Sequence, residues 1–176
     1  MRYYATEILD ALRSTIGNTI GGVDVKAHPE GHPIGWLDDE QNLGGEVTRF
    51  PAIFYVPSED FPAMPYAMDD EGAPLIVTQI YALRICYVMV RGESGNPFEV
   101  VRARGEEIAI ALDPASETPF NLDSTLNSAD RYMGSAVGSV GTWDEVEAFL
   151  RGHHQHLTSS TVDFTMRLHV KPATGW

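Results

Sequence analysis

The sequence predicts an α+β fold in which a mixed or mostly antiparallel sheet with a long, bent central strand is packed by two main helices. The central strand is predicted over 74–91, where β-branched and aromatic residues follow one another without an internal glycine or proline. The helices are predicted over about 4–17 and 97–112, where apolar residues recur every three or four positions. Because this length suits one sizeable core, we expect a single domain over 1–176.

The strand predicted over 74–91 is longer than the domain that should contain it. At about 3.3 Å per residue it would span about 55 Å, whereas a compact domain of this size has a diameter of roughly 40 Å. Both of its faces are mostly apolar, which predicts that other elements cover both along much of the strand. The strand must therefore bend at a bulge or run beyond its own domain, and an apolar overhang would normally find a partner chain.

The helix over 97–112 is marked by its boundary residues. Asn96 suits the N-cap, Pro97 suits the first helical position, and Glu99 stands where a capping box would place it. One stripe of this helix is predicted to face the sheet: Phe98, Val101, Gly105, Ile108 and Leu112. The missing side chain of Gly105 would allow the helix backbone to lie close to the sheet.

Shorter strands complete the predicted sheet. They are expected over 23–28 and 49–56, with a further short strand around 131–140. The run over 159–170 alternates cleanly and predicts a half-buried antiparallel strand. Its inward residues would be Val162, Phe164, Met166, Leu168 and Val170. Residues 142–151 begin with capping-box spacing and suggest a short helix, with a strand as the alternative.

Three long loops are predicted, over 29–48, 57–73 and 113–141. The loop over 57–73 interleaves prolines with large apolar residues, a composition that suits a contact surface because proline lowers the entropy lost on ordering. Cover for the protein's own core is the alternative. The candidate contact residues are Trp36 from the first loop and Phe61, Met64, Tyr66 and Met68 from the second.

The net charge of −13 is concentrated in the predicted loops. Residues 21–72 hold eleven acidic and two basic residues, and Asp38, Asp39 and Glu40 form one acidic run. Such a surface argues against specific binding of nucleic-acid phosphates. The three acidic side chains are candidates for the lining of a lumen or its rim, and a simple solvated loop is the alternative.

The search for catalytic and metal-binding motifs identifies no candidate residues. The sequence has no Gly-rich phosphate loop, no G-x-S-x-G elbow and no H-E-x-x-H motif. The histidines over 153–156 are interpreted as a solvated turn, and the single cysteine, Cys86, as a small core residue. We therefore expect no catalytic residue, no cofactor and no metal, and a protein that is not an enzyme. No apolar run is long enough to span a membrane, and folding in the cytoplasm is expected.

The order of the predicted elements resembles that of the tail terminator (tail-completion) proteins of long-tailed bacteriophages and related contractile particles. The resemblance extends from about residue 4 to 170 and rests on an N-terminal helix, a capped later helix and three strand sequences: R-F-P-A-I-F-Y-V, I-V-T-Q-I-Y-A-L-R-I-C-Y-V-M-V and D-F-T-M-R-L-H-V. It implies a homo-oligomeric ring of six copies that caps the tail tube at the junction with the neck. The implied partners are further copies of the chain, the tail tube protein and a neck, connector or sheath protein.

The resemblance also implies a location in the virion, after synthesis in the host cytoplasm, and a ring through which DNA passes without specific binding. The long insertions over 29–48 and 57–73 and the irregular stretch over 113–141 depart from the minimal pattern of the family. Two alternatives therefore remain. One is another phage neck, head-completion or baseplate component, and the other is a small-molecule-binding α+β domain or an enzyme.

Overall fold

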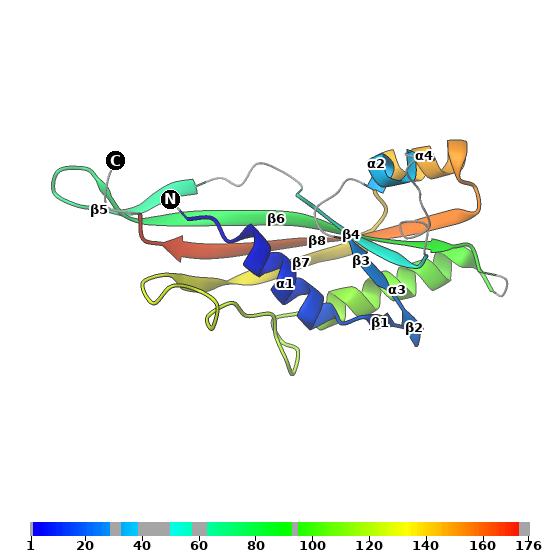
Figure 1. Ribbon diagram of the computed structural model, residues 1–176, viewed down its shortest axis with the longest axis horizontal. Coiled ribbons are helices and arrows are strands. Elements are labelled where there is room, and N and C mark those ends of the chain that lie inside the picture. Colours follow the sequence, from blue (N-terminus) through cyan, green and yellow to red (C-terminus); the bar gives the residue numbers. More distant parts are fainter. Residues whose placement is uncertain (1, 29–32, 39–49, 58–62, 93–94, 173–176) are drawn as a thin grey trace.

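The computed structural model describes residues 2–28, 33–38, 50–57, 63–92 and 95–172 (Figure 1). Its elements follow in the order α1 (Ala5–Ile16), β1 (Thr19–Ile20), β2 (Val23–Asp24), β3 (Lys26–His28), α2 (Pro33–Asp38), β4 (Ala52–Pro57), β5 (Ala63–Met68), β6 (Pro74–Val90), α3 (Pro97–Leu112), β7 (Arg131–Gly141), α4 (Asp144–His153) and β8 (Leu157–Val170). The predicted α+β class is confirmed, with α1 and α3 packed on a mixed, mostly antiparallel sheet.

The main sheet has the strand order β3-β4-β6-β8-β7, and β5 pairs with β6 outside that path. β3 runs parallel to β4, and the other pairs in this sheet are antiparallel. β1 and β2 form a separate antiparallel pair, with a turn at Gly21 and Gly22, where both φ angles are positive. The prediction of one continuous strand over 23–28 is therefore wrong, because β2 turns back on β1 and only β3 joins the sheet.

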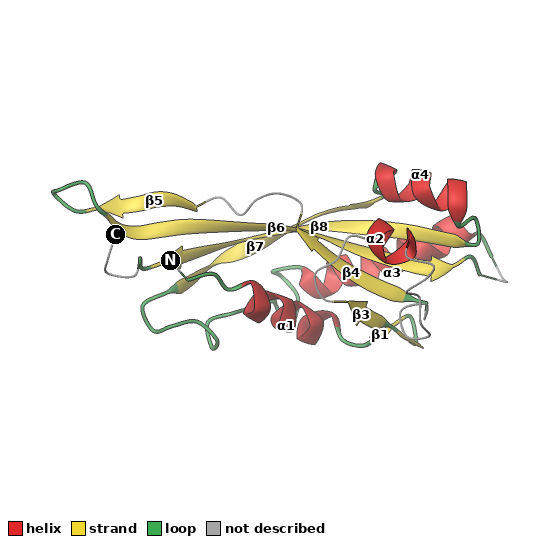
Figure 2. Ribbon diagram, turned by 45° about the horizontal axis from the view of Figure 1, so that its top comes forward, coloured by secondary structure: helices red, strands yellow, loops and turns green. Residues whose placement is uncertain are grey.

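The central strand β6 runs beyond the helices (Figures 1 and 2). One of its edges pairs with β8 from Val77↔Val170 to Val90↔Leu157 without a register shift. Its other edge is shared, with β4 pairing along 83–88 and β5 along 74–79. The sequence predicts that this strand either bends at a bulge or runs beyond its own domain. In the structure it runs beyond the helices, and its pairing with β8 contains no bulge.

We call the overhanging part of the sheet the arm: it comprises β5, residues 74–82 of β6, 131–137 of β7 and 163–170 of β8. Both views show these strand ends extending away from the end of the sheet that carries α3 and α4 (Figures 1 and 2). β7 agrees to within one residue with the strand predicted around 131–140. The arm is therefore a four-stranded extension of the main sheet.

The larger core lies between the sheet and the helices α1 and α3. The predicted inward residues of β8 are all buried, and they meet Tyr81, Leu83 and Ile85 of β6 on the same face. Phe120 and Leu122, from the stretch that the sequence predicts only as a loop, are also buried in this core. Part of the irregular segment 113–130 thus covers the sheet.

Helix α3 begins and ends where the sequence predicts. The Asn96 side chain accepts a hydrogen bond from the Phe98 amide at 3.1 Å, as expected of an N-cap. A Cβ atom at Gly105 would lie 2.6 Å from Cγ1 of Val140, which confirms the predicted close approach to the sheet. The predicted burial of Phe98 is wrong: its ring is exposed, and the Arg91 guanidinium lies 5.6 Å from the ring centroid.

Helix α4 covers the opposite face of the sheet at one end only. Its Val146 and Leu150 pack against Cys86 and Val88 of β6, in a second, smaller core. Of the two alternatives predicted for 142–151, a helix or a strand, the structure shows the helix. The predicted capping box is absent, because the N-cap is Trp143 and its side chain makes no capping hydrogen bond.

Beyond that smaller core, the face of β6 opposite α1 and α3 is only half-buried from Ile76 to Arg84. The prediction that both faces of β6 are covered along much of its length is therefore wrong. Within the described ranges, no helix combines the length and the apolar character needed to cross a membrane.

Candidate interaction surface

The arm exposes large apolar side chains on its outer strand β5. Met64, Tyr66 and Met68 are 51%, 64% and 57% exposed. The prediction of an unbroken loop over 57–73 is wrong here, because residues 63–68 pair with β6. These three predicted contact residues lie on one strand, β5. Because they are more than half exposed, their side chains do not serve as buried cover for the protein's own core.

A tight turn holds β5 against β6. Oδ1 of Asp69 accepts hydrogen bonds from the amides of Glu71 and Ala73, at 3.0 and 2.8 Å. The positive φ of 81° at Gly72 lets the chain reverse there, since glycine adopts this conformation without a Cβ clash. The Asp69 side chain thus has a local structural role in this turn.

The apolar side chains of β5 continue onto one face of the arm. In an antiparallel pair, residues opposite each other project to the same side, so Met64 shares a face with its partner Thr78. Thr78 is in turn opposite His169 of β8, and the His169 ring lies 4.1 Å from the Tyr66 ring, centroid to centroid. We call this side, opposite α1 and α3, the open face of the arm.

The open face combines apolar residues with an arginine. Ile76 and Ile80 of β6 alternate with the core-facing Val77, Gln79 and Tyr81, and both are half-buried. Arg167 of β8 lies opposite Ile80 and is exposed. Arg167 also lines a shallow depression of about 250 Å³ whose other lining residues are Met133, Gly134, Ser135, Ala136 and Thr165.

The two free edges of the arm are irregular. β5 carries Pro65, which has no amide hydrogen to donate, and its register with β6 shifts between Pro65 and Ala67. The pairing of β7 with β8 shifts twice, between Tyr132 and Ser135 and between Val137 and Val140. Proline and bulges at edge strands oppose the addition of a further strand. The arm therefore offers its open face more readily than its edges.

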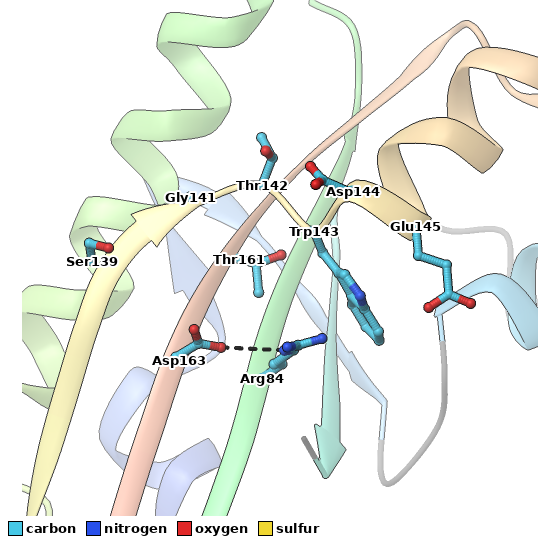
Figure 3. A pocket seen from close by; sticks show the side chains of 9 residues that line it. All are labelled: Arg84, Ser139, Gly141, Thr142, Trp143, Asp144, Glu145, Thr161 and Asp163. Carbon is cyan, nitrogen blue, oxygen red and sulfur yellow. Dashed lines mark ion pairs between the residues drawn. The ribbon is translucent and has the colours of Figure 1, made fainter. Parts of the chain in front are cut away.

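Next to the arm, on the same sheet face, lies a pocket of about 530 Å³, and Asp163 belongs to both (Figure 3). Its lining residues are Arg84, Ser139, Gly141, Thr142, Trp143, Asp144, Glu145, Thr161 and Asp163. Nε of Arg84 lies 3.5 Å from Oδ1 of Asp163, and the guanidinium lies 4.9 Å from the Trp143 ring centroid. Ion pairing and a cation–π contact both act on this arginine.

The strands and α4 fix the acidic groups around this pocket. Asp163 stands on β8, opposite Arg84 of β6, and Asp144 and Glu145 begin α4. Acidic residues in the first turn of a helix are favoured by the helix dipole, which explains why this turn carries them. Three carboxylates and one guanidinium therefore line the pocket, and Asp163 is paired with that guanidinium.

Burial shifts the pKa of several titratable side chains in the described ranges, Cys86 and His28 among them. Burial raises the pKa of the Cys86 thiol to about 12, which leaves it unreactive as a nucleophile at neutral pH. Burial also lowers the pKa of His28, whose ring stacks on Phe54 with centroids 4.7 Å apart. Within the described ranges, no group of three or more histidine, cysteine or acidic side chains is placed to hold a metal.

Several predicted site residues fall outside the described part of the chain. Phe61, Asp39 and Glu40 are among them. Trp36 and Asp38 belong to the backbone of α2, but their side chains lie outside the description. The acidic lumen or rim therefore stays a prediction.

The sequence did not single out Ile76, Ile80 or Arg167, although the two-residue period of their strands places them on one face once the pairing is known.

Compared with known proteins, this sequence matches no protein-family model and no curated protein.

Proposed function

We propose that this protein is a non-enzymatic structural protein that assembles with copies of itself into a ring. The observation that carries the proposal is the arm, which extends beyond the helices (Figure 1) and exposes Met64, Tyr66 and Met68 of β5. Contiguous exposed apolar residues of this kind mark interaction sites in soluble proteins. A neighbouring subunit that lies on these side chains would remove them from water.

The ring is proposed to cap the end of a bacteriophage tail tube and to connect it to the neck, as the resemblance to tail terminator proteins implies. An interface between two different surfaces of the same chain closes into a ring when its rotation permits. Six copies are the stoichiometry implied by the family. The tube protein and a neck, connector or sheath protein are the proposed partners, and the virion is the proposed location.

The net charge of −13 is compatible with a conduit for DNA. Like charge repels phosphates, so a negatively charged passage lets DNA move without adhering. The proposal includes no specific binding of nucleic acid, no cofactor and no membrane.

Native mass spectrometry of the purified protein, alone and with tube protein, tests the proposal. We expect a closed ring of about six copies in at least one of these two conditions. Replacing Met64, Tyr66 and Met68 together by serine should raise the protein concentration needed for assembly by at least tenfold. The monomer should stay folded, because these exposed side chains contribute little to the core.

A matched control carries three other exposed apolar residues replaced by serine, namely Val23, Phe98 and Ile110, which are 47%, 57% and 69% exposed and lie outside the arm. This control should assemble like the parent. A parent protein that stays monomeric at high concentration, with and without tube protein, would refute the proposal. Capture of a portal or adaptor protein in place of tube protein would instead indicate another neck component.

A further inference from the structure

We propose that the pocket of about 530 Å³ beside the arm, called here the Arg84–Trp143 pocket, binds a neutral, polyhydroxylated ligand of the carbohydrate class. The inference goes beyond the proposed assembly and does not depend on it. It rests on the size of the pocket, on the balance of its charges and on the hydrogen-bonding groups that surround it (Figure 3).

The pocket has the volume of a small-molecule site and a largely polar lining. Ligand pockets span roughly 300–1,000 Å³, and this one falls within that range. Among the described residues that line it, Trp143 supplies the large apolar surface, whereas most of the others carry hydroxyl or charged groups. An apolar ligand would cover these polar groups without giving them a partner, which costs free energy. The lining therefore favours a polar ligand.

The charges of the pocket largely cancel. Arg84 lies 3.5 Å from Asp163, and Glu145 already has a partner. Asp144 is the remaining acidic residue of the lining, and its place in the first turn of α4 puts it in the favourable field of the helix dipole. The pocket thus offers little net charge to attract an ion. The ligand that fits this balance is polar but uncharged.

The pair of Arg84 and Asp163 presents both hydrogen-bond donors and acceptors. A guanidinium has five N–H groups, and the contact with Asp163 joins Nε to Oδ1, so the Nη groups and Oδ2 can bind a ligand. The Trp143 ring, 4.9 Å from the guanidinium, helps to fix its orientation. Since a hydroxyl group both donates and accepts, neighbouring hydroxyls of one ligand can use both sides of this pair.

Thr161 adds a hydroxyl that lacks a partner. The residue lines the pocket and is only 6% exposed, yet Oγ1 has no hydrogen-bond partner within the described ranges. The residue opposite it on β6 is Cys86, whose thiol is a weak hydrogen-bonding group. A buried hydroxyl without a partner costs free energy. Rotation about χ1 can present this hydroxyl to a ligand, which would recover that cost.

A sugar ring combines the properties that this lining requires. Its C–H groups form an apolar face, which suits the Trp143 side chain, and its rim carries adjacent hydroxyls. The carboxylate of Asp144 can accept from two such hydroxyls, and the Arg84 guanidinium can donate to them. Aromatic wall, balanced charge and mixed donors and acceptors therefore point to the same class of ligand.

Saturation-transfer NMR on the full chain tests the site with glucose, galactose, mannose and N-acetylglucosamine at millimolar concentration. We expect transfer to at least one of these sugars, and none to two charged probes, acetate and ethylammonium. Asp144→Asn and Thr161→Val should each weaken binding of that sugar about tenfold, since each removes a hydrogen-bonding group. Thr161→Val should fold as stably as the parent, because a methyl group of similar shape replaces an unsatisfied buried hydroxyl.

Asp70→Asn is the matched control, because Asp70 is an exposed acidic residue in the turn between β5 and β6 and does not line the pocket. This variant should bind the sugar like the parent. Absence of transfer to every sugar would overturn the site, and so would a sugar that binds both pocket variants as tightly as the parent. Stronger binding of acetate or ethylammonium than of the sugars would overturn the ligand class. The proposed function is decided separately, by the mass of the assembled protein.

Discussion

The hydroxyl of Tyr4 donates a hydrogen bond to Oδ2 of Asp130, and both side chains are buried beneath the arm. The second oxygen of Asp130 accepts from the amide of Lys171 at 2.8 Å. The backbone amide of Tyr4 donates to the hydroxyl of Tyr81, which donates to Gln79 at 2.7 Å. One small network thus ties the N-terminal segment to β6 and to the end of β8.

Replacing Tyr4 by phenylalanine should lower the free energy of unfolding by about 1–3 kcal/mol, because the buried Asp130 carboxylate loses a donor. Urea denaturation measures the change. Tyr3→Phe is the matched control, since the Tyr3 side chain is more than half exposed, and it should stay within about 0.5 kcal/mol of the parent. Equal stabilities of the two variants would mean that the Tyr4–Asp130 bond contributes nothing.

Gly105→Ala should destabilise the protein by about 1–3 kcal/mol, because the added Cβ would lie 2.6 Å from Val140 and 2.8 Å from Oγ of Ser160. Gly152→Ala, in α4, has open space around it and should be neutral or stabilising, by up to about 1 kcal/mol. Thermal melting of the two variants compares them directly. A Gly105→Ala protein as stable as the parent would contradict the close packing of α3 on the sheet.

Cys86 should resist alkylation in the folded protein. Its thiol is buried under α4, and burial raises its pKa to about 12, so the thiolate fraction at pH 8 is on the order of a thousandfold below that of a free cysteine. Iodoacetamide labelling followed by mass spectrometry should show modification only as denaturant unfolds the chain. Rapid labelling without denaturant would mean that α4 opens readily.

Stability should fall as the pH drops below about 6.5, and His28 should account for part of the loss. Burial lowers the pKa of His28 in the folded protein, so the unfolded chain binds more protons in this range. His28 makes its full contribution to the free energy of unfolding at pH values above its pKa in the unfolded chain. That contribution is lost as the pH falls toward the lower pKa that His28 has in the folded protein. His28→Gln should show a shallower pH dependence in urea titrations at pH 5, 6 and 7.5, and an unchanged slope would contradict the assignment.

Sequence patterns predicted the elements whose signals are local. Asn96 and Pro97 mark the start of α3 without reference to the rest of the chain, and the alternation from Val162 to Val170 identifies the buried face of β8. Strand β5 was missed because Pro65 and a bulge interrupt the two-residue period that identifies strands.

Features that depend on distant parts of the chain could not be predicted in this way. The bond between Tyr4 and Asp130 joins positions 126 residues apart, and no local pattern indicates it. Met64, Tyr66 and Met68 were predicted as contact residues from their type alone. Their grouping with Arg167 on one face follows only from the register of β5, β6 and β8.

The pairing of β6 with β8 has a consequence during synthesis. Residues 91–156 separate the two strands in the chain, so β6 leaves the ribosome well before its main partner exists. At about 5–20 residues per second, this delay amounts to roughly 3–13 s. Throughout that interval the apolar β6 has one unpaired edge, and nascent chains stalled before Leu157 should bind chaperones that chains released after Val170 no longer bind.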